Sequence, residues 1–288
     1  MDDSLEGKAA LVTGGARRVG AAIARRLHAA GAKVLIHYRD SEADAARLEA
    51  EFNAARPKSA AKVKAELLAP IAPRALLLAA LEGFGRLDIL VNNASSFFPV
   101  EVGKIESSHW EELIGSNLRA PLFIAQQAAA ELAKNEGCIV NIVDIHAERP
   151  LKGYALYSVA KAGLAAMTRA LALELAPRVR VNGVAPGAIA WPEDGQFAEG
   201  ERVRIVSTTP LARTGTPEDI ARAVHFLACA SYVTGQILAV DGGFDAAGSG
   251  CHRCRTGADG QTMSKRSLFA EFKRRNVYRA AVIYAGTR

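Results

Sequence analysis

A tyrosine and a lysine four residues apart form the pair with the clearest chemical potential in this sequence. Tyr157 and Lys161 fall in an Ala- and Leu-rich stretch that predicts a helix over 154–176. Positions i and i+4 share one helix face. An ammonium group beside a phenol favours tyrosinate, so we expect the pKa of Tyr157 to fall from about 10. Such a tyrosine can give a proton to a substrate.

Two further polar residues are expected to join this pair. Asp144 ends a predicted strand over 138–144, and Asn117 lies in a predicted helix over 107–134. We therefore expect Asp144, Asn117, Tyr157 and Lys161 to form one catalytic group. The alternative for Asp144 is a strand-end cap or a member of a buried ion pair.

A glycine-rich segment after the first predicted strand has the composition of a phosphate-binding loop. It consists of Thr13-Gly14-Gly15-Ala16-Arg17-Arg18-Val19-Gly20 and leads into a predicted helix over 19–30. The glycines permit a tight turn and close backbone approach, and the helix N-terminus offers N–H groups to a pyrophosphate. An ordinary tight turn is the alternative interpretation.

Arginines near this loop favour NADP(H) over NAD(H). The second predicted strand ends in Tyr38-Arg39-Asp40-Ser41, where NAD enzymes usually have an acid for the ribose. We expect Arg17 and Arg39 to converge on a 2′-phosphate, with Ser41 donating a hydrogen bond. Asp40 opposes this assignment because it could bind a ribose hydroxyl, and solvated surface charges remain the alternative for the arginines.

The ends of two further predicted strands also offer cofactor contacts. The third ends in Ala65-Glu66-Leu67, where the acid could meet the adenine, and the fourth ends in Asn92-Asn93-Ala94. Small groups there can lie along a cofactor, although asparagine pairs are also common in turns.

Strand and helix patterns alternate along the chain, which predicts an α/β fold with a Rossmann-type doubly wound parallel sheet. Strands are expected at 8–13, 33–38, 61–66, 88–91, 138–144, 179–184 and 236–240. Helices are expected at 19–30, 41–55, 73–84, 107–134, 154–176 and 217–229. The alternation stops near residue 243, so we expect one domain over 1–247. Residues 248–288 are expected to be a Gly/Ser-rich linker and basic tail, poorly ordered or an appended helix.

Composition excludes several classes of protein. Half of the 288 residues are hydrophobic, and no run of about 20 apolar residues predicts a membrane span. The N-terminus does not resemble a secretory signal, so we expect a cytoplasmic protein.

The net charge of +6 arises from residues 249–288, which contain nine Lys/Arg and two acids, so the remainder gives no argument for nucleic-acid binding. Cys251-His252-Arg253-Cys254 lacks a second ligand pair, and we expect no metal site.

Taken together, these motifs resemble the short-chain dehydrogenase/reductase family over about residues 6–244. The motif set is the TG…G loop, Asn92-Asn93-Ala94, Asn117, Tyr157/Lys161, Pro186-Gly187 and the closing VDGG. The resemblance implies a tyrosine proton donor, a lysine that activates it and binds the ribose, and an asparagine that holds a water. It also implies cofactor contacts from Pro186, Gly187 and Ile189, and a homotetramer.

Two departures from the family's usual pattern resemble the pteridine reductases within it. Arg18 replaces the middle loop glycine, and Asp144 replaces the usual serine. That resemblance implies reduction of C=N bonds in pterins or dihydrofolate-like substrates, with Phe97 stacking on the pterin. Ser95 and Arg17 would hydrogen-bond to the ring, which Asp144 and Tyr157 would also contact. Plain loop packing is the alternative for Phe97-Phe98.

The chemistry is consistent with the aspartate. A carbonyl reductase needs a neutral donor near a developing oxyanion, whereas reduction of C=N needs a proton on a ring nitrogen. Two other functions stay open: an NADPH-dependent carbonyl or 3-oxoacyl reductase, and a non-catalytic nucleotide-sensing regulator.

Overall fold

The computed structural model describes residues 3–189 and 198–246. The predicted tail, its C-x-x-C motif and residues 190–197 lie outside these ranges.

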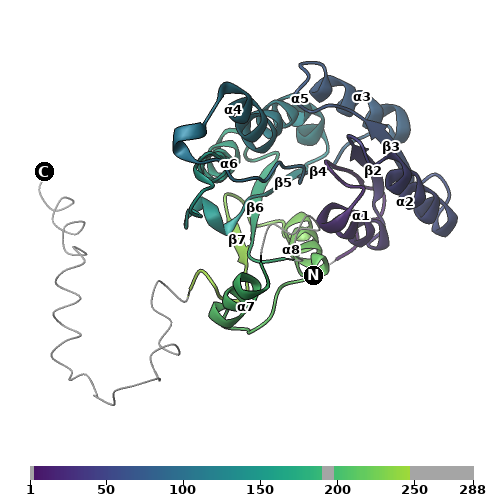
Figure 1. The fold of residues 1–288 in the computed structure, drawn as a ribbon. Helices are drawn as coiled ribbons and strands as arrows, with labels where there is room; N and C mark the ends of the chain where they lie inside the picture. Colours follow the sequence, from purple (N-terminus) through teal and green to yellow (C-terminus); the bar gives the residue numbers. More distant parts are fainter. Residues whose placement is uncertain (1–2, 190–197, 247–288) are drawn as a thin grey trace, which may run out of the picture. The chain divides into compact units, whose positions relative to one another are not determined.

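Seven parallel strands form a single sheet in the order β3-β2-β1-β4-β5-β6-β7, as Figure 1 shows. The strands are β1 (Ala9–Val12), β2 (Lys33–Tyr38), β3 (Ala60–Lys64), β4 (Ile89–Asn92), β5 (Cys138–Ile142), β6 (Arg180–Pro186) and β7 (Ile237–Val240). Every residue of β1, β4 and β5 is buried, which explains why their apolar runs lack alternation. The predicted Rossmann-type doubly wound sheet is confirmed.

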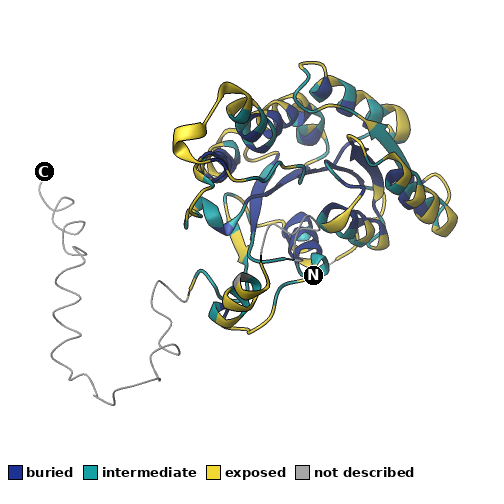
Figure 2. Ribbon diagram, viewed as in Figure 1, coloured by how far each residue is buried: buried dark blue, intermediate teal, exposed yellow. Residues whose placement is uncertain are grey.

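Helices cover both faces of this sheet. They are α1 (Arg18–Ala29), α2 (Glu42–Ala55), α3 (Ala72–Phe84), α4 (Ser107–Ile114), α5 (Ala120–Lys134), α6 (Ala155–Glu174), α7 (Glu199–Thr208) and α8 (Pro217–Cys229), with 3₁₀ turns η1 (Val102–Lys104) and η3 (Ile145–Ala147). One hydrophobic core joins α1, α2 and α8 to the sheet, and a second joins α3, α5 and α6 to it. In Figure 2 the buried sheet lies between helices whose outer faces are exposed. None of the helices within the described ranges is long and apolar enough to cross a membrane.

The structure corrects the helix predictions in two places. The predicted helix 107–134 is divided into α4 and α5 by the π-helical segment η2 (Gly115–Arg119), in which the N–H of Ala120 bonds to the carbonyl of Gly115. Pro121 follows immediately and has no N–H for the regular helical ladder, which favours this wider turn. Helix α7 was not predicted.

The sheet order creates one functional edge. The chain runs from β1 through β2 to β3 on one side and from β4 to β7 on the other, so the strand order reverses between β1 and β4. Parallel sheets of this kind bind ligands beyond the carboxyl ends of the strands at that point. The loops after β1, β2, β4 and β5 therefore meet at the place where the sequence predicts a cofactor and a catalytic group.

A buried carboxylate joins three segments at the opposite end of the sheet. The side chain of Asp88 is fully buried, and its Oδ2 accepts hydrogen bonds from the N–H of Ala9 at 2.9 Å and from Arg86 Nε at 2.8 Å. Its carbonyl accepts from the N–H of Cys138 at 2.8 Å. Asp88 thereby links the first residues of β1 and β5 to the loop before β4.

Asp88→Asn should lower the free energy of unfolding by about 1–3 kcal/mol, because an amide cannot accept from both Ala9 and Arg86 with full charge. Denaturant melts would measure the change. Glu136→Gln is the matched control, because its ion pair with Arg178 is exposed on both sides and should contribute under about 1 kcal/mol. Equal losses in the two variants would contradict the buried role of Asp88.

Candidate active site

Three predicted catalytic residues lie together beyond the carboxyl end of β5. The hydroxyl of Tyr157 donates to Asp144 Oδ2 at 2.7 Å, and the ammonium of Lys161 lies 5.7 Å from the centre of the tyrosine ring. Lys161 also donates to the carbonyl of Ile142 at 2.9 Å. The i, i+4 spacing on α6 brings Tyr157 and Lys161 to one face, as the sequence predicts.

Asp144 has two hydrogen-bonding roles at once. Strand β5 ends at Ile142, two residues earlier than predicted, and Asp144 is the N-cap of η3, where its Oδ1 accepts from the N–H of His146 at 2.8 Å. The second oxygen binds Tyr157. The cap and the catalytic interpretation of Asp144 are therefore compatible, because they use different oxygens.

The electrostatics of Tyr157 differ from the sequence-based expectation. Burial, the negative charge of Asp144 and the hydrogen bond to it raise the pKa of Tyr157 well above its ordinary value. Burial lowers the pKa of Lys161 to about 8, although Asp144 opposes this shift. The expected lowering of the tyrosine pKa is wrong for this structure, because the phenol donates to a carboxylate and the lysine donates elsewhere.

Asn117 lies in the π-helical segment η2 with one polar atom unsatisfied. Its Nδ2 donates to the carbonyls of Ser96 at 2.9 Å and Leu113 at 3.0 Å. Its Oδ1 is buried without a hydrogen-bond partner among the described residues. A buried acceptor of this kind needs a donor from a ligand or water, so the structure is consistent with a bound group near Asn117.

The loop after β1 is closely tied to the loop after β4. Thr13 Oγ1 accepts from the N–H groups of Asn93 at 2.9 Å and Ala94 at 3.1 Å. Asn93 Nδ2 donates back to the carbonyls of Thr13 at 2.9 Å and Gly14 at 3.1 Å. A Cβ at Gly20 would lie only 2.1 Å from the carbonyl oxygen of Gly14, so only glycine permits this packing. The predicted cofactor residues Thr13, Gly14, Gly20, Asn93 and Ala94 are thus brought together.

His37 contributes a contact that sequence reasoning missed. It is buried at the end of β2, where Nδ1 accepts from the N–H of Gly14 at 2.9 Å and Nε2 lies 3.0 Å from the carbonyl of Ala65. These partners require the proton on Nε2, and burial lowers the pKa of His37. The N–H of Gly14 is therefore already bound, which leaves the N-terminus of α1, including Val19, to offer backbone N–H groups to phosphates.

Arg18, the departure from the usual loop glycine, adopts a left-handed conformation with φ +50°. This region disfavours side chains other than glycine and costs of order 1–2 kcal/mol. The chain tolerates that cost at the first residue of α1, where the exposed side chain of Arg18 lies at the rim of the predicted phosphate site.

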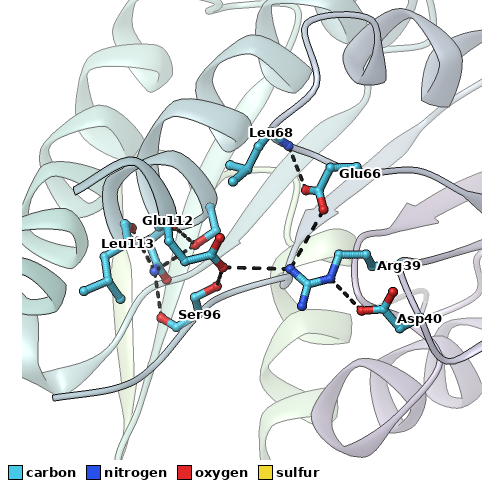
Figure 3. Close-up of polar contacts among 9 residues, drawn as sticks. Arg39, Asp40, Glu66, Leu68, Ser96, Glu112 and Leu113 are labelled. Atoms are coloured by element: carbon cyan, nitrogen blue, oxygen red, sulfur yellow. Dashed lines mark hydrogen bonds and ion pairs between the residues drawn. The ribbon is translucent and has the colours of Figure 1, made fainter. Parts of the chain in front are cut away.

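The two arginines predicted to read a 2′-phosphate point to different partners in this structure. Arg17 lies 3.5 Å from Asp44 of α2, whereas Arg39 donates to Asp40 at 2.8 Å. Figure 3 shows the Arg39 guanidinium between Glu66 and Glu112, at 3.9 and 3.8 Å. Other predicted contacts surround this region: Tyr38 is buried at the end of β2, Ser41 is the half-buried N-cap of α2, and Leu67 is half-buried after β3.

The aromatic side chain expected to hold a substrate, Phe97, is close to Tyr157. Phe97 is stacked on Tyr154 with ring centres 4.6 Å apart, and it meets Tyr157 edge-on at 4.8 Å. Tyr154 thus covers one face of Phe97, a contact that the sequence did not reveal. Ser95 is exposed on the same loop.

The loop after β6 supplies the remaining predicted cofactor residues. Pro186 ends β6, Gly187 donates its N–H to the carbonyl of Val240 at 3.0 Å, and Ile189 forms a bridge with Gly215. In the described ranges 3–189 and 198–246, no three or more His, Cys, Asp or Glu side chains are grouped to hold a metal ion.

Comparison with known proteins identifies this arrangement. Residues 14–245 match a family described as enoyl-(acyl carrier protein) reductase. The chain is 40% identical over 286 aligned positions to pteridine reductase 1 of Leishmania tarentolae, which covers 85% of this chain and 98% of that protein. The chain belongs to the short-chain dehydrogenase/reductase family.

Other members of the family with different printed activities are almost as similar. The granaticin polyketide synthase putative ketoacyl reductase 2 of Streptomyces violaceoruber is 37% identical, covering 84% of this chain and 97% of that protein. The 3beta-hydroxysteroid dehydrogenase 1 of Eggerthella lenta is also 37% identical, covering 84% and 95%. The chain is therefore an oxidoreductase of this family, which uses NAD or NADP as cofactor, and a non-catalytic regulator is no longer a competing hypothesis.

Lys161→Met should raise the free energy of unfolding at pH 7 by about 1–3 kcal/mol while abolishing turnover. The folded-state pKa of Lys161, about 8, lies below the ordinary 10.5. The buried charge therefore destabilises the fold below pH 8, and this cost disappears as pH rises to about 10.5.

Denaturant melts at several pH values would measure this gain, which should shrink as the pH approaches 10.5. Lys134→Met, which removes an exposed lysine at the end of α5, should change stability by less than about 0.5 kcal/mol. A Lys161→Met protein that is less stable than the wild type at neutral pH would refute the conclusion that the buried charge of Lys161 destabilises the fold.

Proposed function

We propose that this enzyme reduces C=N bonds in pterins of the dihydrobiopterin, dihydromonapterin or dihydrofolate class, with NADPH as the reductant. The observation that supports this most directly is the 2.7 Å hydrogen bond between Tyr157 and Asp144, at the position where carbonyl reductases of the family have serine. The relative named pteridine reductase 1 is consistent with it.

The residues present fit a dinucleotide. Gly14 and Gly20 allow the loop backbone to pack closely, α1 begins at that loop, and Asn117 Oδ1 is a buried acceptor without a hydrogen-bond partner among the described residues. Thr13, Arg17, Arg18, Val19 and Gly20 would contact the phosphates. The remaining contacts would come from Tyr38, Arg39, Ser41, Glu66, Leu67, Asn93, Ala94, Tyr157, Lys161, Pro186, Gly187 and Ile189.

When bound, NADPH would supply the hydride that adds to the ring carbon of the C=N bond. The protein must then supply a proton to the adjacent nitrogen. Because its pKa is raised, Tyr157 keeps its proton at neutral pH and can donate it at that moment. Lys161, buried beneath the ring, would stabilise the tyrosinate left behind, and Asp144 would orient the hydroxyl and bind the pterin.

The carboxylate is also what disfavours the alternative reaction. A carbonyl substrate develops negative charge on its oxygen, and Asp144 beside Tyr157 would repel that charge. Protonating a ring nitrogen involves no such oxyanion. Reduction of a ketone or a 3-oxoacyl thioester is the second candidate, and its support is the 37% identity to the putative ketoacyl reductase.

The substrate would lie against the loop after β4. Phe97 offers one face to a flat pterin ring, because the other face is covered by Tyr154. Ser95 and Arg17 would supply hydrogen bonds to the polar edge of the ring.

We further propose that the reductase domain, residues 1–247, assembles as a cytoplasmic homotetramer. Two separate sets of exposed apolar residues support this: Trp110, Phe123 and Val159 on α4, α5 and α6, and Phe226 and Leu238 on α8 and β7. A tetramer with two kinds of two-fold interface needs two separate apolar surfaces. The tail, residues 248–288, is an appended segment in this proposal.

Asp144→Ser separates the two candidate functions. Turnover of dihydrobiopterin should fall by roughly 10²–10⁴-fold, the usual contribution of a positioned acid–base group. Activity on an activated ketone should stay level or rise, and NADPH affinity should hardly change. Steady-state oxidation of NADPH with both substrates would measure this, and an unchanged rate with the pterin would remove the main support for a pteridine reductase.

Arg17→Ala and Arg39→Ala should weaken NADPH binding about tenfold to a hundredfold but leave NADH binding nearly unchanged. Each removes a charge-assisted contact to phosphate of about 1.5–3 kcal/mol. Calorimetric titration with both cofactors would measure the difference. Arg25→Ala on α1, which removes an arginine paired with Glu51, is the matched control, and equal losses for NADPH and NADH would refute the 2′-phosphate assignment.

A further inference from the structure

The side chain of Arg39 is surrounded by three carboxylates. We call these four residues the Arg39 cluster: Arg39, Asp40, Glu66 and Glu112. Its Nε donates to Asp40 at 2.8 Å, and its Nη1 lies 3.9 Å from Glu66 and 3.8 Å from Glu112. Figure 3 shows the guanidinium bridging these groups. The arginine expected to bind a phosphate is therefore already paired with protein anions.

Glu112 differs from the other two acids in its origin. Asp40 follows β2 and Glu66 follows β3, on the same side of β1 as Arg39 itself. Glu112 belongs to α4, which follows β4 on the other side of the point where the strand order reverses. The Arg39–Glu112 pair therefore joins the two halves of the sheet at the edge where the cofactor is expected.

The carboxylate of Glu112 is held in place by the side chain of Ser96, which lies beside it. Ser96 donates its hydroxyl to Glu112 Oε1, the same oxygen that faces Arg39. The carbonyl of Ser96 in turn accepts from Asn117 Nδ2 at 2.9 Å. Glu112 is thus anchored to the loop that leads to Phe97, rather than free to follow Arg39.

We propose that Glu112 is a specificity-determining residue for the cofactor: its carboxylate competes with the ribose 2′-phosphate for Arg39. A phosphate that binds Arg39 must draw the guanidinium away from Glu112. NADH, which has no phosphate at this position, leaves the pair intact. The competition therefore reduces the preference for NADPH over NADH without touching the reacting atoms.

The size of the effect follows from exposure. The side chains of Arg39 and Glu112 are 55% and 33% exposed, and ion pairs this accessible to water are weak. Loss of the competing charge should therefore change NADPH affinity only about twofold to fivefold. A dianionic phosphate can overcome a competitor of this strength, so NADPH still binds in the wild-type enzyme.

Glu112→Gln tests the inference, which rests on the proposed use of NADPH. The amide oxygen can still accept from Ser96, so the variant keeps the local fold, and a thermal melt checks this. Calorimetric titration of the full chain should show NADPH binding tightened about twofold to fivefold and NADH binding unchanged. In an Arg39→Ala background the same substitution should have no effect on either cofactor.

Glu111→Gln is the control for long-range charge. Glu111 is the exposed neighbouring residue on α4, and its substitution removes the same negative charge. Glu111→Gln should therefore change the affinity for NADPH and for NADH by less than Glu112→Gln changes the affinity for NADPH. Equal gains from both variants, or a gain that persists without Arg39, would overturn the inference.

The Arg39→Ala single variant distinguishes the two levels of failure. If it weakens NADPH selectively but Glu112→Gln changes nothing, only the role of Glu112 is refuted. If Arg39→Ala affects both cofactors equally, the assignment of the 2′-phosphate to Arg39 fails and the role of Glu112 fails with it.

Discussion

The parallel pairing of β1 with β2 on one side and β4 on the other is the constraint on which the remaining features depend. It brings the carboxyl ends of these strands to one edge and makes the strand order reverse between β1 and β4. Hydrogen bonds between Thr13 and Asn93, which involve both side chains and the adjacent backbone, then hold the loop after β1 against the loop after β4. Without this pairing, the glycine-rich loop after β1 would not be held beside the loops after β4 and β5 or near helix α6.

The catalytic region shows how one residue type changes the chemistry of a common scaffold. Tyr157 and Lys161 lie on one face of α6, and Asp144 accepts a hydrogen bond from the hydroxyl of Tyr157. Burial raises the pKa of Tyr157, and the charge of Asp144 raises it further, a contribution that a neutral serine would not make. In the proposed function, the electrostatic difference between reducing a carbonyl and reducing a C=N bond depends largely on this one side chain after β5.

The cofactor end shows a comparable balance of charges. Arginines 17, 18 and 39 give this edge its cations, yet Asp40, Asp44, Glu66 and Glu112 are interspersed with them. Recognition of an anionic ligand at such an edge depends on which of these groups it displaces. A count of arginines in the sequence predicts only the sign of a preference for NADP(H) or NAD(H) and says little about its size.

The sequence by itself predicted the parallel sheet, the order of its strands along the chain and the residues of the candidate catalytic group. These follow from local patterns: apolar runs for buried strands, i and i+4 spacing on a helix, and glycines at a turn. Only the tertiary structure decided that Asp144 opposes the ionisation of Tyr157, that His37 binds the N–H of Gly14, and that Arg39 reaches Glu112. Each of these contacts joins residues from separate elements, so its distance and its electrostatic effect depend on packing that no local pattern encodes.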